Sequence, residues 1–241
     1  MSDTNDQLVL IGGYSSMGKS ASLMNIRNKD KWIYLNSESG KKLPFKNNFD
    51  SYRIEDPLQV MEAFDYATTE VSVEGLILDS LTFLMDMYET QYIIPAANGM
   101  KAWSDFAQFF KVMMQQKVVA INKPVIMTAH VLDVLDEKNM EMRTSVPIKG
   151  SLKNQGVEAY FSTIVYAKRL PLKELKGYEN SMLTITEDDK INNFKHVFQT
   201  RVTKGTTGER IRSPMGMFSR EETFINNDAQ MLLDFLKEYY K

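Results

Sequence analysis

Short apolar runs alternate with amphipathic stretches along the first half of the chain. The apolar runs predict buried strands at residues 7–11, 32–35, 76–78 and 125–128. Helices are expected at residues 18–26, at residues 58–67 after Pro57, and at residues 103–118, where Phe106, Phe109, Phe110 and Met113 share one face. Strands that alternate with helices favour an α/β fold with a mostly parallel central sheet flanked by helices.

The pattern becomes richer in strands towards the carboxyl end. A short helix is expected at residues 152–161, strands at 163–168, 182–186 and 196–202, and a last helix at about 226–240, capped by Asn226 or Asn227. The late strands predict a C-terminal β-hairpin extension of the sheet. Without an internal repeat or a long linker, residues 1–241 are interpreted as one domain, with its core at about 7–215.

Composition narrows the class of protein. The 241 residues are 43% hydrophobic, which suffices for a core, and no stretch approaches the ~20 apolar residues of a membrane span. Residues 1–7 are polar and lack a signal-peptide pattern. The absence of cysteine excludes disulfides and thiolate metal sites, and the two histidines lie far apart in the sequence. These features favour a cytoplasmic protein that does not associate with a membrane.

The charge is unevenly distributed along the chain. Its formal net value is −2, but residues 143–213 hold thirteen Lys or Arg against seven Asp or Glu, a local net of +6 that leaves −8 for the rest. Ordinary solvated surface and contact with nucleic acid both account for such a basic stretch.

A glycine-rich segment follows the first predicted strand and matches G-x-x-x-x-G-K-[ST] from Gly13 to Ser20. Successive backbone N–H groups and the amino end of a helix can hold a triphosphate there, and glycines let the main chain approach it closely. The expected nucleotide-binding residues are Gly13, Tyr14, Ser15, Ser16, Met17, Gly18, Lys19, Ser20 and Ala21. Lys19 is expected to contact the β- and γ-phosphates of ATP. The alternative is a glycine turn that binds nothing.

Polar residues end the other predicted strands. Asp79 follows residues 75–78 and, with the Ser20 hydroxyl, is expected to hold Mg²⁺, usually through water on the Asp79 side. Glu38 follows the second strand and can orient and deprotonate the water that attacks ATP. His130 follows the fourth strand, where it can contact the γ-phosphate. From spacing alone, an exposed loop glutamate and a capping histidine are the simpler interpretations of Glu38 and His130.

Taken in order, these motifs resemble the RecA-type P-loop ATPase core over about residues 7–215. In that family the glutamate after the second strand is the catalytic base, a role that the resemblance assigns to Glu38. The family usually carries Gln at the sensor position, where this chain has His130. More narrowly, Asn36-Ser37-Glu38 with Leu43-Pro44-Phe45, Thr128-Ala129-His130 and residues 148–152 resemble the short RecA-like single-strand annealing proteins of bacteriophages.

The resemblance implies DNA-binding and subunit-bridging segments. The segment after the sensor, residues 131–155, would be a mobile DNA-binding loop; residues 133–141 are acidic, and Arg143, Lys149 and Lys153 are the candidates for phosphate contacts. Residues 88–101 are a second candidate segment. Arg201 and Lys204, with Arg210 as a third candidate, lie at an expected hairpin tip and would reach the γ-phosphate of a neighbouring subunit. Plain solvation is the alternative for all of these cations.

The preferred hypothesis is a Mg²⁺-dependent, DNA-stimulated ATPase that assembles as a ring or filament on single-stranded DNA and promotes annealing or recombination. A single-strand DNA-binding protein is a further partner, and a phage-encoded protein would act in the bacterial cytoplasm. A RecA-fold hexameric helicase or motor and a nucleotide switch that binds protein remain open alternatives. A small-molecule kinase is least favoured, because no lid or acceptor-site pattern is present.

Overall fold

The computed structural model describes residues 4–137 and 140–241. Residues 1–3, part of the polar amino-terminal stretch, and residues 138–139, within the acidic part of the expected DNA loop, lie outside the described residues. Strands are β1 Leu8–Gly13, β2 Trp32–Asn36, β3 Asp50–Arg53, β4 Gly75–Asp79, β5 Val125–His130, β6 Leu132–Asp136, β7 Glu141–Ser145, β8 Thr163–Pro171, β9 Phe194–Gln199 and β10 Phe224–Asn226. Helices are α1 Gln59–Thr69, α2 Leu81–Tyr88, α3 Gly99–Val112, α4 Val118–Ala120, α5 Glu187–Asn192 and α6 Ala229–Tyr239.

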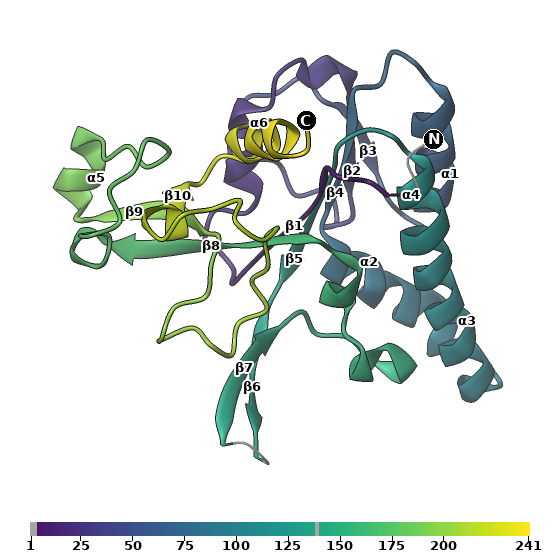
Figure 1. Cartoon of the computed structure of the whole chain (residues 1–241). Helices are drawn as coiled ribbons and strands as arrows, with labels where there is room; N and C mark the ends of the chain where they lie inside the picture. The colour runs from purple at the N-terminus through teal and green to yellow at the C-terminus, as the bar shows by residue number, and fades with distance from the viewer. Residues whose placement is uncertain (1–3, 138–139) are drawn as a thin grey trace.

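Eight strands form one twisted sheet in the order β10-β9-β8-β1-β5-β4-β2-β3 (Figure 1). The six strands from β8 to β3 run parallel to one another, whereas β9 is antiparallel to both of its neighbours, β8 and β10. The chain is therefore α/β with a large, mostly parallel sheet flanked by helices. Because β5 lies between β1 and β4, the ends of these three strands meet at one edge of the sheet.

The sheet is buried on both faces, and successive residues of a strand point to opposite cores. Leu8 and Leu10 of β1 pack towards the helices α1, α2 and α3. Val9 and Ile11 pack on the other face, against Leu23 and the α6 side chains Leu232, Leu233 and Leu236. Figure 1 shows α1, α3 and α4 on one side of the sheet and α6 on the other. The continuous apolar runs in the sequence follow from this double burial.

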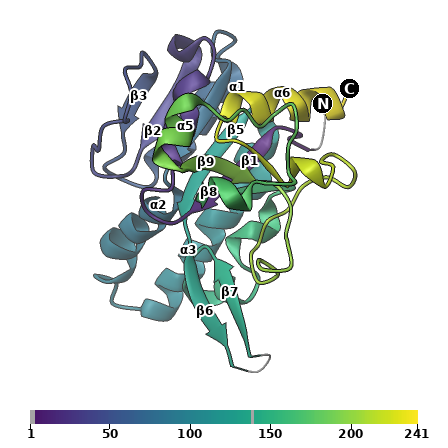
Figure 2. The same ribbon diagram turned by 90° about the vertical axis from the view of Figure 1, so that its left-hand side faces the viewer.

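The strands β6 and β7 form a separate two-stranded hairpin. Both views show it extending away from the sheet (Figures 1 and 2). The prediction of a loop at residues 131–155 is therefore wrong for its first part, which is a hairpin. Apolar side chains lie exposed on it, namely Leu132, Val134, Leu135 and Met142. None of the helices in the described part of the chain is long and apolar enough to cross a membrane.

Two predicted helices are shorter and tighter than expected. The helix at residues 18–26 is a 3₁₀ helix, Ser20–Asn25. Its serines compete with the helical backbone: the Ser22 hydroxyl donates to Lys19 O at 2.6 Å. The expected helix at residues 152–161 consists of two 3₁₀ helices, Gly150–Asn154 and Val157–Tyr160. Gly156, with φ +76°, lies in the left-handed region and interrupts them.

Three further predictions near the carboxyl end are wrong. Residues 182–186 form no strand, because Met182 N and Thr184 N bond to the side chains of Asn180 and Asn226. The strand expected at 196–202 ends at Gln199, so Arg201 and Lys204 lie in the long connection to β10 and not at a tight hairpin tip. The cap of the last helix is Asp228, whose carboxylate accepts from Met231 N at 3.0 Å.

Candidate nucleotide site

The cradle segment, residues 13–20, turns around the ammonium group of Lys19. Lys19 Nζ donates to Gly13 O and Tyr14 O, at 2.9 Å each. Burial lowers the pKa of Lys19 to about 8, because its charged form is desolvated. Gly18 adopts φ +99°, and a Cβ there would lie 2.7 Å from Asn227 Nδ2, so the position requires glycine. The segment is thus folded around a single desolvated cation.

The carboxyl-terminal part of the chain braces this segment. Asn227, between β10 and α6, donates from Nδ2 to Gly18 O at 2.9 Å. His196 of β9 lies with Nδ1 3.1 Å from Met17 O, which requires a proton on Nδ1. Neither contact is visible in the sequence, because 179 and 209 residues separate the partners. The β9 and β10 extension therefore fixes the cradle segment from outside.

Asp79 is buried at the end of β4, with 2% of its surface exposed. Its Oδ2 accepts from the Tyr34 hydroxyl of β2 at 2.8 Å, and its Oδ1 accepts from the Thr128 hydroxyl of β5. Burial, together with the adjacent Asp79 charge, raises the pKa of Tyr34, which therefore stays a donor. The neighbouring strands thus hold the carboxylate in a fixed orientation.

Glu38 and His130 form a chain of polar contacts with two lysines. The Lys19 ammonium lies 3.4 Å from His130 Nδ1, and His130 Nε2 lies 3.4 Å from Glu38 Oε1. Lys41 Nζ donates to Glu38 Oε2 at 2.8 Å. Since an ammonium only donates, Nδ1 acts as the acceptor and Nε2 carries the proton towards Glu38. The His130 contact, followed by the Lys41 contact, lowers the pKa of Glu38 to about 2.

A cavity of about 740 Å³ brings these residues together. Its walls include Ser15, Ser16, Gly18, Lys19, Ser20 and Ala21 from the expected binding segment, Tyr34 within β2, and the strand-end residues Glu38, Asp79 and His130. The remaining three expected residues, Gly13, Tyr14 and Met17, do not line this cavity. The carbonyls of Gly13 and Tyr14 bond to Lys19, and Met17 packs against the core. Residues from β2, β4 and β5 and their ends therefore share one space with the cradle segment.

The possible metal ligands in this cavity suit a magnesium ion that is shared with phosphate and water better than a metal ion held only by protein side chains. Across residues 4–137 and 140–241, no three His, Cys, Asp or Glu side chains cluster to hold a metal. Ser20 and Asp79 line the same cavity and offer one hydroxyl and one carboxylate. Mg²⁺ typically takes one or two such ligands and completes its shell with phosphate and water. Because both Asp79 oxygens already accept hydrogen bonds, contact through water fits this site.

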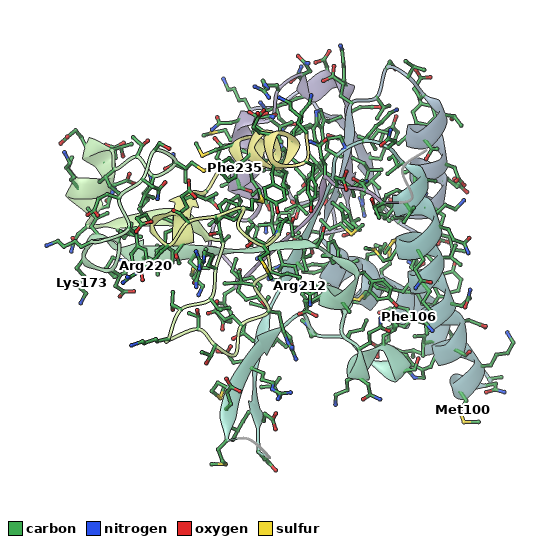
Figure 3. All side chains as sticks on the ribbon, viewed as in Figure 1. Met100, Phe106, Lys173, Arg212, Arg220 and Phe235 are labelled. Atoms are coloured by element: carbon green, nitrogen blue, oxygen red, sulfur yellow. The ribbon has the colours of Figure 1, made fainter. Side chains whose placement is uncertain are left out.

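The three candidate DNA-binding residues line a second cavity, of about 700 Å³, at the base of the β6–β7 hairpin. Two of them are paired with carboxylates. Arg143 Nη2 lies 2.6 Å from Asp136 Oδ2, and Lys149 Nζ lies 2.8 Å from Glu89 Oε2, within the second candidate segment. Lys153 also lines this cavity, as do Arg210 and Arg212. Figure 3 shows Arg212 near the base of the hairpin, with Phe106 on α3.

Arg201 and Lys204 lie away from the cavity of their own chain. Both are exposed in the connection between β9 and β10, and neither lines the 740 Å³ cavity. Arg201 Nη1 donates to Phe218 O at 3.0 Å. Both cations therefore lie exposed, outside the cavity that contains Lys19.

Several residues of the site escape recognition in the sequence. Tyr34, Lys41 and Thr128 each contact a strand-end carboxylate. Thr128 precedes His130 by two residues on one strand, so both side chains lie on the same face of the sheet. This spacing was a usable signal that Thr128 belongs to the site. Ser39-Gly40 before Lys41 is a turn signal that returns the chain towards Glu38. No comparable local signal marks Tyr34, His196 or Asn227.

Comparison with known proteins assigns no family to this chain. No protein-family model matches the sequence, and no curated protein matches it closely enough to count as a relative. The function must therefore be argued from the geometry of the site.

Proposed function

We propose that this chain is an ATPase with a RecA-like core that binds single-stranded DNA, assembles with copies of itself and promotes annealing or recombination. The observation that carries the proposal is the shared cavity. Lys19, Asp79, Glu38 and His130 come from four separate strand ends, and all of them line one 740 Å³ space. Ligands of open parallel sheets bind at the carboxyl ends of the strands, as this arrangement requires. The position of β5 between β1 and β4 is compatible with a RecA-like core.

Lys19 supplies the main positive charge for the phosphates. Its ammonium, now bonded to two backbone carbonyls, is desolvated and gains a stronger partner when a triphosphate enters. Backbone N–H groups of the cradle segment hold the phosphate oxygens. Ser20 and Asp79 would hold Mg²⁺, which neutralises charge on the β- and γ-phosphates when it is bound.

Glu38 is the general base of the proposed reaction. A water oxygen attacks the γ-phosphorus, while the bond from that phosphorus to the bridging oxygen breaks and the electron pair leaves with ADP. The proton of the water passes to the Glu38 carboxylate. The His130 imidazole contacts both Glu38 and Lys19. Loss of the γ-phosphate would change the contacts of these two side chains, and His130 would respond to that change. His130 continues through Val131 into β6 and hence into the hairpin.

The hairpin and the second cavity are the proposed DNA surface. Arg143, Lys149 and Lys153 meet there. In the ion pairs of Arg143 and Lys149, the cationic side chain is the more exposed partner. Exposed ion pairs typically contribute only about 0–1 kcal/mol to stability. DNA phosphates can therefore replace the carboxylates at small cost.

Self-assembly would complete the nucleotide site. Arg201 and Lys204 face outward from their own chain, so a neighbouring copy can receive them at its γ-phosphate. A cation in that position stabilises the charge of the transition state and couples hydrolysis to assembly.

The acidic and apolar character of the hairpin favours a second candidate, a nucleotide switch that binds protein. Leu132, Val134 and Met142 are each more than half exposed, and Asp136 neutralises Arg143. Exposed apolar side chains of this kind suit a protein partner. Salt-sensitive binding of single-stranded DNA would argue against this alternative.

Electron microscopy with single-stranded DNA tests the proposal. The protein is imaged with the DNA in the presence and absence of Mg²⁺ and a non-hydrolysable ATP analogue. We expect nucleotide-dependent coating of the strand, reduced in the Lys19→Ala variant. If the protein binds nucleotide but neither assembles nor retains DNA, the proposal is contradicted and the nucleotide-switch hypothesis takes its place.

A further inference from the structure

Residues 38–41 form a tight turn that returns Lys41 to Glu38. Lys41 N donates to Glu38 O at 3.0 Å, and the two residues between them, Ser39 and Gly40, have φ +53° and +77°. The Asn36 side chain brackets this turn. Its Oδ1 accepts from Glu38 N at 3.0 Å, and its Nδ2 donates to Lys41 O at 2.8 Å. The backbone around Lys41 is therefore fixed by contacts on both sides.

The two side chains of this pair differ greatly in freedom. The Glu38 side chain is 7% exposed, whereas that of Lys41 is 65% exposed, although the Nζ–Oε2 distance is 2.8 Å. Both residues line the 740 Å³ cavity that also contains Lys19 and Ser20. Lys41 can therefore exchange its partner within this cavity without a change in the backbone.

In this arrangement Glu38 is occupied on both oxygens. Oε2 accepts from Lys41, and Oε1 faces His130 Nε2 at 3.4 Å. Lys19, Tyr34 and Asp79 are further titratable groups near this carboxylate and Lys41. A carboxylate held by two nitrogen donors is a weak base, and its pKa of about 2 reflects this. Proton transfer from water would require one of these donors to leave.

The γ-phosphate is a stronger partner for Lys41 than Glu38 is. The Lys41 end of the pair is largely exposed, so solvent weakens its attraction to Glu38, whereas a terminal phosphate carries more charge and three strong acceptor oxygens. We propose that Lys41 is a second phosphate-binding cation, which holds Glu38 when no γ-phosphate is present and moves to that phosphate when a triphosphate binds. This transfer frees Glu38 Oε2 for the attacking water. The inference rests on the proposed ATPase function of this cavity.

As a consequence, the site would distinguish ATP from ADP. Only a triphosphate offers the group that draws Lys41 from Glu38, so the base is available only when there is a substrate to hydrolyse. After the γ-phosphate leaves, Lys41 returns to Glu38 and the carboxylate is again occupied.

Binding of Mg·ADP and of a non-hydrolysable Mg·ATP analogue to Lys41→Met tests this transfer. Calorimetry should show that Lys41→Met weakens the ATP analogue about tenfold, the loss of one charge-assisted hydrogen bond, and weakens ADP less than twofold. Lys41→Arg should retain most of the affinity. Lys190→Met is the matched control, because it removes another lysine–glutamate pair at the same spacing, outside the cavity; neither affinity should change.

A double-mutant cycle with Glu38→Gln separates the transfer from a general effect of charge. Glu38→Gln should release Lys41 and so raise the affinity for the ATP analogue. This increase should be several-fold larger in a chain that has Lys41 than in the Lys41→Met variant, which has no lysine to release. In the wild-type background, kcat should fall about 10²-fold in Lys41→Met, with a smaller change in KM. Additive effects, or equal losses for ADP and the ATP analogue, would overturn the inference while leaving the ATPase proposal standing. No binding of either nucleotide to the wild-type protein would overturn both.

Discussion

At the residue scale, the proposed chemistry depends on the carboxylate of Glu38. Glu38→Gln keeps the shape of the side chain, but it replaces one carboxylate oxygen with an amide group and removes the ability to take a proton. We expect ATP to bind and turnover to fall about 10²–10⁴-fold, the usual contribution of a general base. Steady-state hydrolysis assays measure this, with the exposed Glu62→Gln as the control. Full activity in Glu38→Gln would remove it as the base.

The same residue gives a pH dependence of folding stability. The folded-state pKa of Glu38, about 2, lies below its ordinary value of 4.5, so its contribution is fully present above pH 4.5 and is lost as pH falls towards 2. Glutamine does not titrate. The difference in unfolding free energy between wild type and Glu38→Gln should therefore shrink between pH 5 and pH 3, as urea unfolding would show. A difference that stays constant over this range would contradict the assigned contacts.

At the element scale, one hydrogen-bonded junction links the cradle segment to the β6–β7 hairpin. The Tyr14 hydroxyl donates to Asp133 Oδ1 at 2.6 Å, and the Thr144 hydroxyl donates to the same oxygen at 2.6 Å. Thr144 N also donates to Gly208 O at 3.0 Å, in the connection that carries Arg201. Burial and the hydrogen bond to Asp133 raise the pKa of Tyr14 to about 12, so the hydroxyl remains a donor.

Tyr14→Phe tests whether this junction couples nucleotide to DNA. The aromatic ring stays, so the affinity for ATP should change less than about threefold. Nucleotide is expected to increase the affinity for DNA, and this increase should be about 5–10-fold smaller in Tyr14→Phe, which is a typical size for coupling between two sites. Fluorescence anisotropy with labelled single-stranded DNA measures this. Tyr52→Phe is the control, because Tyr52 bonds to Asp50 at 2.8 Å on the exposed edge strand β3. Equal coupling in wild type and Tyr14→Phe would exclude the junction as a route.

The elements that the sequence predicted are those buried on both faces or on a broad apolar face. The runs at β1, β4 and β5 are continuous because helices cover both sides of the sheet, and α3 buries its predicted aromatic face. β3 was missed because all four of its residues are exposed. Likewise, the strands β6 and β7 pair only with each other outside the main sheet, and the apolar residues at 132–135 do not alternate cleanly.

At the scale of the whole molecule, the outward position of Arg201 and Lys204 predicts complementation between subunits. Lys19→Ala lacks its own phosphate cation but can still donate Arg201 to a neighbour. The Arg201→Ala, Lys204→Ala double variant has an intact cavity but donates nothing. Mixtures of the two inactive proteins should recover up to about a quarter of wild-type ATPase activity, since some interfaces pair an intact cavity with an intact donor. Activity that never exceeds the sum of the two components would contradict action across subunits.

The site was predictable where one motif or strand end carries its residues. The spacing from Gly13 to Ser20 and the terminal Asp79, Glu38 and His130 led to residues that share one cavity. The bracing by His196 and Asn227 was not predictable, because it arises only when the β9–β10 extension folds back against the cradle segment. The Lys149 partner, Glu89, lies 60 residues away in the segment after α2, a distance that leaves no local pattern. The Arg143 partner, Asp136, lies across the β6–β7 hairpin, which the sequence pattern did not predict.

Isothermal titration of the wild-type protein with Mg·ATP tests the central claim most directly. The account predicts saturable binding at one site per chain, weakened at least about tenfold in Lys19→Ala, because a desolvated charge-assisted contact is lost. Lys237→Ala, on the exposed side of α6, should bind as wild type does. Absence of heat or saturation with folded wild-type protein, or equal affinity in Lys19→Ala, would contradict the account.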